Sequence, residues 1–97
     1  MTQKLPFNKK LFNLTRLGIM LNLDDELGTF SELKEFCELT DGNLASHLRV
    51  LEKLGFVSSS KSFVGRKPQT TFKVTTLGKE NLEALKDWFY ETFLEGG

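Results

Sequence analysis

A six-residue stretch near the middle of the chain, "ELTDGN" at residues 38–43, strongly limits how the segments before and after it can be arranged. Apolar residues recur at helical spacing on both sides of it, over residues 30–38 and 41–54. Thr40 and Asp41 are good N-cap residues and Gly42 relieves the backbone, so the second helix begins soon after the first ends. Two helices joined by so short a turn must cross steeply, which predicts a helix-turn-helix unit.

The predicted helix over 41–54 has an apolar side and a polar side. The apolar side is a line of leucines: Leu44, Leu48 and Leu51, flanked by Leu54. The opposite side carries Asn43, Ser46, Arg49, Val50 and Lys53, so short hydrogen-bonding groups come first and cations follow farther along. Such groups read base edges in the major groove and hold phosphates, although an ordinary solvated helix face has a similar composition. His47 lies at the boundary of the two sides, where it is either a packed imidazole or a DNA contact.

The segment after Gly55 has the composition of a β-hairpin over residues 56–75. Two runs rich in β-branched and aromatic residues, 60–64 and 70–75, read as its strands. The turn between them, residues 65–68, has the sequence Gly-Arg-Lys-Pro. It places two cations at the tip of the hairpin, where they cannot help a core.

Two further helices, over residues 8–23 and 76–94, are predicted near the ends of the chain. Each is apolar on more than one side, whereas a helix that packs on a small domain needs only one apolar stripe. The surplus predicts a second burial partner, most simply the same helices of another copy in a twofold homodimer. The residues expected at that interface are Leu11, Leu14, Trp88, Phe89 and Phe93.

The formal net charge is zero, but the charges are sorted along the chain. Residues 1–23 carry four cations and no acid, whereas residues 24–41 carry seven acids against one lysine. Residues 42–79 carry seven cations against Glu52, and residues 80–97 carry five acids against Lys86. Such a chain can present one cationic face to a polyanion while its other faces stay acidic, and chance clustering on a solvated surface is the alternative.

The residues give little support to several other classes of protein. At 97 residues the chain fits one domain, 1–97. No apolar run approaches the roughly 18 residues of a membrane span and the first ten residues lack a secretion-signal pattern, so we expect a cytoplasmic protein. Cys37 and His47 alone would make a poor metal site, so we expect neither a metal nor another cofactor. With no nucleophile elbow and no phosphate loop, we do not expect an enzyme.

Three stretches of the chain together resemble the small archaeal and bacterial winged helix-turn-helix regulators related to the MarR and ArsR families. They are "LTDGNLASHLRVLEKLGFV" at 39–57, "KSFVGRKPQTTFKVT" at 61–75 and "TLGKENLEAL" at 76–85, and the resemblance covers roughly residues 10–90. The fold that this resemblance implies is mainly α with a small β-hairpin. It would have three helices, a hairpin that forms the wing, and a C-terminal dimerisation helix.

The resemblance also implies a homodimer that binds double-stranded DNA at a specific sequence and regulates transcription, most simply as a repressor. The helix over 41–54 would enter the major groove. The wing would reach along the backbone or into the minor groove, where the negative potential is strong. The implied DNA contacts are Asn43, Ser46, His47, Arg49 and Lys53 on the helix, and Lys61, Arg66, Lys67, Gln69 and Thr70 on the wing.

Two features depart from the pattern of these families. Metal sensors of the ArsR type carry paired cysteines or ligands on the terminal helices, and this chain has only Cys37, so we do not expect metal sensing. Many relatives have Gly at the end of the second helix, where this chain has Glu38; a left-handed backbone there would cost roughly 1 kcal/mol. Any pocket for a small-molecule effector would be small and would form at the dimer seam.

The alternative function is that of a winged-helix subunit that binds other proteins within a larger assembly. Modules of that kind usually lose the cations on the third helix and on the wing. This chain retains them at Arg49, Lys53, Lys61, Arg66 and Lys67, which favours DNA.

Overall fold

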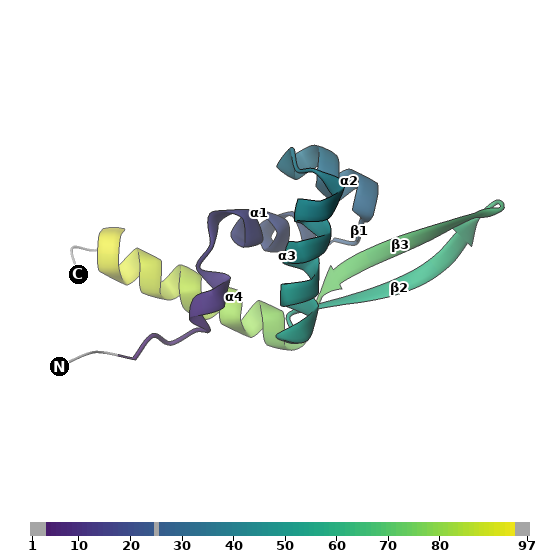
Figure 1. Ribbon diagram of the computed structural model, residues 1–97. Coiled ribbons are helices and arrows are strands. Elements are labelled where there is room, and N and C mark those ends of the chain that lie inside the picture. Colours follow the sequence, from purple (N-terminus) through teal and green to yellow (C-terminus); the bar gives the residue numbers. More distant parts are fainter. Residues whose placement is uncertain (1–3, 25, 95–97) are drawn as a thin grey trace.

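The computed structural model describes residues 4–24 and 26–94. Within these residues the chain forms four α-helices and a three-stranded antiparallel sheet (Figure 1). The helices are α1 (Leu14–Leu23), α2 (Phe30–Cys37), α3 (Asp41–Lys53) and α4 (Thr76–Phe89), and a π-helical turn (Tyr90–Leu94) extends α4. The strands are β1 (Gly28–Thr29), β2 (Val57–Val64) and β3 (Lys67–Val74), in the spatial order β1-β3-β2. This is the mainly helical winged helix-turn-helix fold that the sequence predicts, with one short strand added.

The single helix predicted over residues 8–23 is wrong in its first half. A short 3-10 helix (Lys9–Leu11) comes first, and α1 begins only at Leu14. Asn13 is extended, with φ −145° and ψ 125°, and its side chain accepts the N–H of Arg16 at 3.1 Å. Asparagine favours such caps because its side chain competes for backbone N–H groups. It therefore divides a segment whose apolar spacing alone reads as one helix.

α2 begins at a capping box and ends at a left-handed residue. Thr29 Oγ1 accepts the N–H of Glu32 at 3.1 Å, and Glu32 Oε1 accepts the N–H of Thr29 at 2.9 Å. The hydrogen bond from the Thr29 N–H to the carboxylate, together with the Thr29 side chain, favours the ionised form and lowers the pKa of Glu32. At the other end, Glu38 has φ 53° and ψ 49°, and the N–H of Leu39 donates to the carbonyl of Lys34 at 3.1 Å. The backbone at Glu38 is therefore left-handed, the case for which the sequence analysis gives a cost of roughly 1 kcal/mol.

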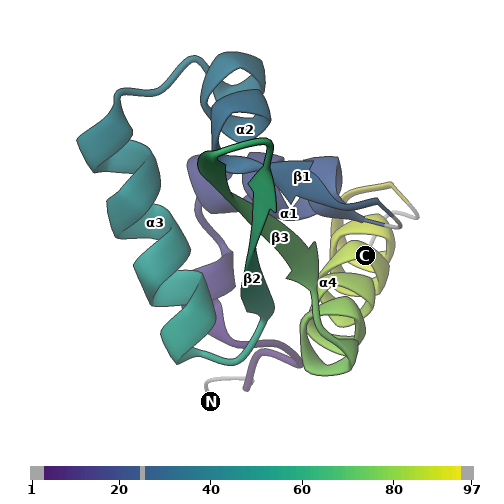
Figure 2. The same cartoon turned by 90° about the vertical axis from the view of Figure 1, so that its right-hand side faces the viewer.

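α3 follows after a connection of residues 38–40, as a helix-turn-helix unit requires. The hydroxyl of Thr40 accepts the N–H of Asn43 at 3.2 Å and caps the helix. Lys34 Nζ lies 2.8 Å from Asp41 Oδ1 and links the two helices across the turn. Figure 2 shows α3 on one side of the hairpin and α4 on the other, with α2 above. The hairpin therefore emerges between α3 and α4.

The two paired strands are longer than predicted and the turn between them is shorter. β2 and β3 pair along their whole length, out to Val64 opposite Lys67, so only Gly65 and Arg66 form the turn. Gly65 has φ 66°, a conformation that glycine adopts without strain and that a two-residue hairpin turn needs. The predicted four-residue turn over 65–68 is therefore wrong, because Lys67 and Pro68 belong to β3.

The outer part of the hairpin projects away from the helices. β1 pairs only with Phe72 and Thr71 of β3, so the hairpin has no third strand beyond its base. Figure 1 shows its tip extending well past α3, and the molecule has principal extents of 56 × 25 × 21 Å. β1 was absent from the sequence prediction because two residues are too short for a periodic signal. The projecting hairpin is the wing of the fold.

α4 is joined closely to the end of α3. Gly78 packs against the backbone of Phe56, and a Cβ at Gly78 would lie 2.3 Å from the Phe56 carbonyl oxygen. The hydroxyl of Thr75 donates to the carbonyl of Gly55, and the N–H of Thr75 donates to the carbonyl of Phe56 at 2.9 Å. Thr75 Oγ1 also caps α4 by accepting the N–H of Gly78 at 3.0 Å. We call this contact, made by residues 55, 56, 75 and 78, the α3–α4 joint.

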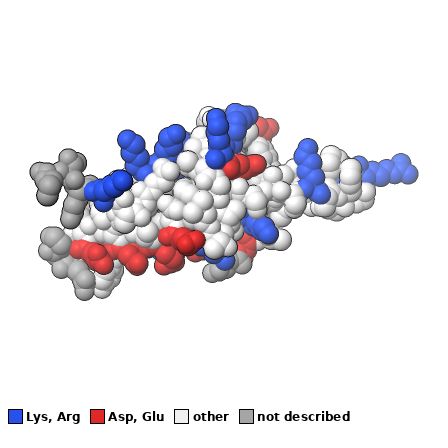
Figure 3. All heavy atoms as spheres, turned by 90° about the horizontal axis from the view of Figure 1, so that it is seen from below, with Lys and Arg blue, Asp and Glu red and all other residues white. Residues whose placement is uncertain are grey.

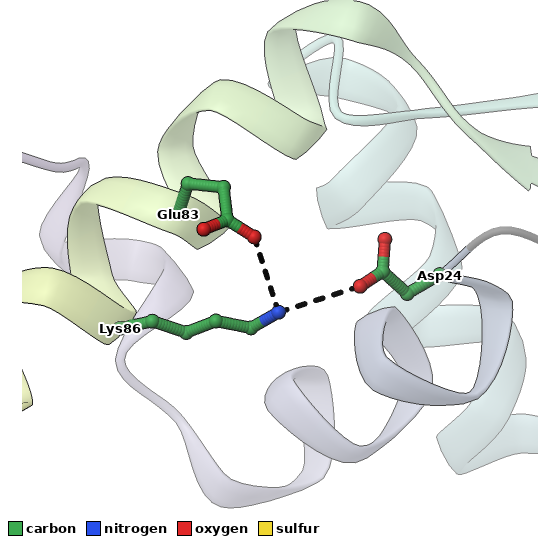
Figure 4. A network of polar contacts seen from close by, with 3 residues as sticks. All are labelled: Asp24, Glu83 and Lys86. Carbon is green, nitrogen blue, oxygen red and sulfur yellow. Dashed lines mark hydrogen bonds and ion pairs between the residues drawn. The ribbon is translucent and has the colours of Figure 1, made fainter.

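The hydrophobic core lies where the helices meet the base of the hairpin. Its largest fully buried side chains are Leu11, Ile19, Met20, Leu23, Leu33, Leu44, Leu51 and Leu82. At the surface, Lys86 Nζ lies 3.4 Å from Asp24 Oδ2 and 3.3 Å from Glu83 Oε1 (Figure 4). Burial lowers the pKa of Lys86, but the bonds and charges of the two carboxylates outweigh burial and raise it. Such exposed pairs contribute about 1 kcal/mol or less, so this one aligns α4 with α1 without dominating stability.

Candidate nucleic-acid interface

The exposed side of α3 carries the polar residues that the sequence singles out. Asn43 and Ser46 are exposed on the first half of the helix, and Arg49 and Lys53 on the second half. The leucine line on the opposite side is buried, which fixes the side of α3 that faces solvent. Hydrogen-bonding groups therefore precede cations along one accessible helix face, the order in which a recognition helix contacts bases and then phosphates.

His47 lies at the edge of this face and is half-buried. Its Nδ1 atom is buried and has no hydrogen-bond partner among the described residues, and the same is true of Arg16 Nε on α1. Burial lowers the pKa of His47, and the positive charge of Arg16 lowers it further. Both effects favour the neutral imidazole. The two interpretations of His47, a packed imidazole and a DNA contact, both stay predictions.

The three wing cations that the sequence singles out, Lys61, Arg66 and Lys67, are all exposed, and they point in different directions. Successive strand residues alternate between faces, so Lys61 and the opposite Thr70 share the face that continues outward from the core. Lys67 and Gln69 lie on the other face, and Arg66 lies in the turn at the tip. The wing therefore presents positive charge on both faces and at its end. That distribution suits a groove whose two walls both carry phosphates.

A groove runs between the start of α2 and the free edge of β3. It encloses about 270 Å³ and is lined by Thr29, Phe30, Ser31, Pro68, Gln69, Thr70 and Phe72. Gln69 and Thr70 are wing residues that the sequence singles out, whereas Ser31 is not among them. Ser31 is exposed and lies far from the wing in the sequence, so only the folded chain brings these hydroxyl and amide groups together.

The charges are separated in space as well as in sequence. Seen from below, Lys and Arg gather along one edge of the molecule and on the projecting wing, whereas Asp and Glu gather along the opposite edge (Figure 3). Glu80, Glu83, Asp87 and Glu91 are exposed on α4 and its extension. A chain without net charge thus has a cationic side that includes the wing.

The residues expected at a dimer interface differ in their exposure. Leu11 is fully buried in the chain's own core and offers no surface to a partner, whereas Leu14 is 88% exposed. Trp88 is half-buried, and Phe89 and Phe93 are exposed. The ring of Trp88 contacts neighbouring rings at centroid distances of 5.5–5.9 Å, and Phe89 lies 4.9 Å from Phe93. We call this the aromatic cluster; its members are Phe7, Phe12, Trp88, Phe89 and Phe93.

Cys37 is half-buried, and burial raises the pKa of its thiol. Within residues 4–24 and 26–94, no three His, Cys, Asp or Glu side chains are grouped so that they could hold a metal ion. In the same part of the chain, none of the helices combines the length and the apolar character needed to cross a membrane.

Comparison with known proteins identifies relatives along most of the chain. Residues 15–92 match the family model described as a winged helix DNA-binding domain. An uncharacterised protein of Methanocaldococcus jannaschii is 40% identical over 84 residues, which cover 84% of this chain and 88% of the relative. The structure of a transcriptional regulator homologue from Pyrococcus horikoshii OT3 is 38% identical, with a TM-score of 0.70 over 86% of this chain and 87% of that one.

More distant structures share the fold. The zinc-responsive MarR family member ZitR of Lactococcus lactis is 16% identical, with a TM-score of 0.71 over 98% of this chain and 65% of its own. An ArsR family transcriptional regulator is also among the structural neighbours. The family match over residues 15–92 and the 40% identical relative both cover most of the chain. The chain therefore belongs to the winged helix DNA-binding domain family, and its structural neighbours are transcriptional regulators of the MarR and ArsR families.

Proposed function

We propose that this chain is a sequence-specific transcriptional regulator that binds double-stranded DNA as a homodimer and represses transcription by occupying its site. The observation that carries the proposal is the accessible face of α3 beside a wing that is cationic on both faces and at its tip. The residues concerned are exposed and are not needed by the core. Membership of a DNA-binding domain family indicates that the ligand is DNA, and these exposed residues are the proposed contacts.

In the proposed complex α3 lies in the major groove. Its 13 residues span about 20 Å, and its accessible face fits a groove about 12 Å wide. Asn43 and Ser46 contact base edges, where amide and hydroxyl groups can donate and accept hydrogen bonds. Arg49 and Lys53 bind phosphates and fix the register of the helix. His47 supports α3 from its packed side.

The wing contacts the neighbouring part of the duplex. Arg66 at the tip enters the minor groove or follows the backbone, and Lys61 and Lys67 bind the phosphates on either side. Gln69 and Thr70 hold a phosphate at the groove beside α2, together with Ser31. This arrangement uses every exposed cation of the hairpin turn and the outer strands.

The proposed dimer forms through the aromatic cluster. Its outer members, Phe89 and Phe93, are 43% and 60% exposed and lie beside the half-buried Trp88 at the end of α4. Contiguous exposed aromatic rings are uncommon on a monomer, and a twofold contact buries the same patch on both copies. Such a dimer would present two α3 helices to half-sites about 34 Å apart, one turn of the duplex.

The test is fluorescence anisotropy with a labelled duplex from upstream of the protein's own gene, titrated at several salt concentrations against unlabelled random duplex. A dimer that engages about three to four cations per subunit should give a slope of log affinity against log salt of about −5 to −7. Binding that random duplex does not remove would support a specific regulator.

The other outcomes of this titration separate the alternatives. Binding that random duplex removes would show a DNA-binding protein whose site lies elsewhere, and selection from a random pool would then find that site. An absence of binding even at low salt would refute the DNA-binding role and would direct attention to protein partners of α3 and the wing.

A further inference from the structure

One large apolar side chain of the wing has no role in the core or in the proposed contacts. Phe63, near the end of β2, is 74% exposed. Its neighbour Val64 is 62% exposed and points to the other face of the hairpin. The outer hairpin has no third strand, and the helical body ends before it (Figure 1). Nothing in the described chain covers Phe63, so its burial must come from a ligand if it comes at all.

The strand register gives Phe63 a rigid apolar support. Phe63 lies directly opposite Pro68 on β3. Because Pro68 has no N–H, the two residues cannot exchange hydrogen bonds across the strands, and pairs of that kind bring their side chains closest together. The free edge of β3 also leaves room for the proline ring. The tip of the wing is therefore a narrow ridge with Phe63 and Pro68 on one face.

The charge around this ridge indicates what can cover it. Lys61 lies on the same face, two residues before Phe63, and Arg66 and Lys67 follow within four residues. A second wing of this protein would bring like charges together, which opposes contact between two copies at this point. A duplex brings phosphates to the cations and stacked bases to the apolar ring.

We propose that Phe63, supported by Pro68, is a wedge that enters the minor groove and partly unstacks one base step. This inference rests on the proposed function and adds a specificity-determining residue to it. Apolar side chains that enter the minor groove bend the duplex away from the protein side, and pyrimidine–purine steps open at the lowest cost. The wing therefore selects a flexible step beside the bases read by α3, without hydrogen bonds to those bases.

The first experiment is selection of binding duplexes from a random pool by the wild-type protein, Phe63→Ala, Phe63→Leu and the matched control Val64→Ala. The wild-type pool should contain a central motif read by α3 and a TA or CA step at a fixed distance on each side. Phe63→Ala should retain the central motif and lose the flanking step. Phe63→Leu should keep the step, because leucine also acts as a wedge, and Val64→Ala should match the wild type.

The second experiment uses a selected duplex with 2-aminopurine at the flanking step and a donor and acceptor dye at its ends. Wild-type protein should raise the 2-aminopurine fluorescence and bend the duplex, whereas Phe63→Ala should do neither and should bind about tenfold more weakly. Val64→Ala should stay within about twofold of the wild type, as exposed substitutions usually do. The four proteins should unfold within about 8 °C of one another, since residues 63 and 64 are exposed and a cross-strand pair contributes about 1 kcal/mol or less.

The outcomes distinguish failure of the wedge from failure of the proposed function. A wild-type pool with no enriched sequence would refute sequence-specific binding and the wedge with it. An enriched central motif with identical flanking steps and equal bending for the wild type and Phe63→Ala would refute the wedge alone. Equal losses in Phe63→Ala and Val64→Ala would show that apolar surface, and not the face carrying Phe63, is responsible, which also overturns the wedge.

Discussion

Replacing Glu38 by glycine should stabilise the protein, although glycine is usually unfavourable near a helix. The backbone at Glu38 is left-handed, with φ 53° and ψ 49°, and this costs an L-residue roughly 1–2 kcal/mol. Glycine avoids that strain but loses about 0.5–1 kcal/mol more conformational freedom on folding. The net gain for Glu38→Gly therefore lies between about 0 and 1.5 kcal/mol, and its middle value of about 0.75 kcal/mol corresponds to about 3–6 °C in Tm for a chain of this length. None of the ion pairs described for residues 4–24 and 26–94 involves Glu38, so replacing it by glycine removes none of these ion pairs.

The assay is urea unfolding followed by circular dichroism, with two control variants. Glu38→Ala keeps a Cβ at the left-handed position and removes the carboxylate, so its stability should stay within about 0.5 kcal/mol of the wild type. Glu35→Gly places glycine inside α2, where the backbone is right-handed, and should lose about 1 kcal/mol. The reasoning is refuted if Glu38→Gly destabilises the protein, or if Glu38→Ala stabilises it as much as Glu38→Gly does.

Three further predictions concern binding and assembly. Arg66→Ala should weaken binding to all duplexes and flatten the salt slope by about two units per dimer, whereas an equal change in Lys73→Ala, at the base of the hairpin, would contradict a special role for the tip. Asn43→Ala should change which sequence a random pool yields, and a uniform loss across sequences would remove its base-reading role. Phe93→Ala should shift the dimer toward monomer in sedimentation, as should Trp88→Ala, and an unchanged mass would remove the aromatic cluster from the interface.

The elements that could be predicted from the sequence are those set by local chemistry. α3 follows from its leucine line and from Thr40, whose hydroxyl caps the helix as expected. The left-handed backbone at the end of α2 could not be predicted from the sequence, because no local signal forces a glutamate into that conformation. Only the cost that such a backbone would have at Glu38 could be stated from the sequence. Asn13 marked the true start of α1, but an apolar spacing that continues through it hid the break.

The elements that could not be predicted depend on contacts between distant segments. β1 exists because Gly28 and Thr29 pair with β3, and two residues carry no pattern of their own. The groove beside α2 joins Ser31 to Gln69 and Thr70, which only the fold brings together. The spacing of apolar residues also does not distinguish residues that are buried in the core of one chain from residues that are exposed and available to a partner. Leu11 and Phe93 belong to similar stripes, yet Leu11 is fully buried and Phe93 is 60% exposed.

The α3–α4 joint has a consequence for the distance between the two half-sites that the proposed dimer would bind. Gly78 leaves no room for a side chain against Phe56, and Thr75 ties the start of α4 to Gly55 at the end of α3. If the C-terminal end of α4 contacts α4 of the second copy and its N-terminal end is fixed to α3, then α4 keeps α3 at a constant distance from the symmetry axis of the dimer. The α3–α4 joint would then set the spacing of the two half-sites. Relatives with different side chains on α3 would read different bases at the same interval.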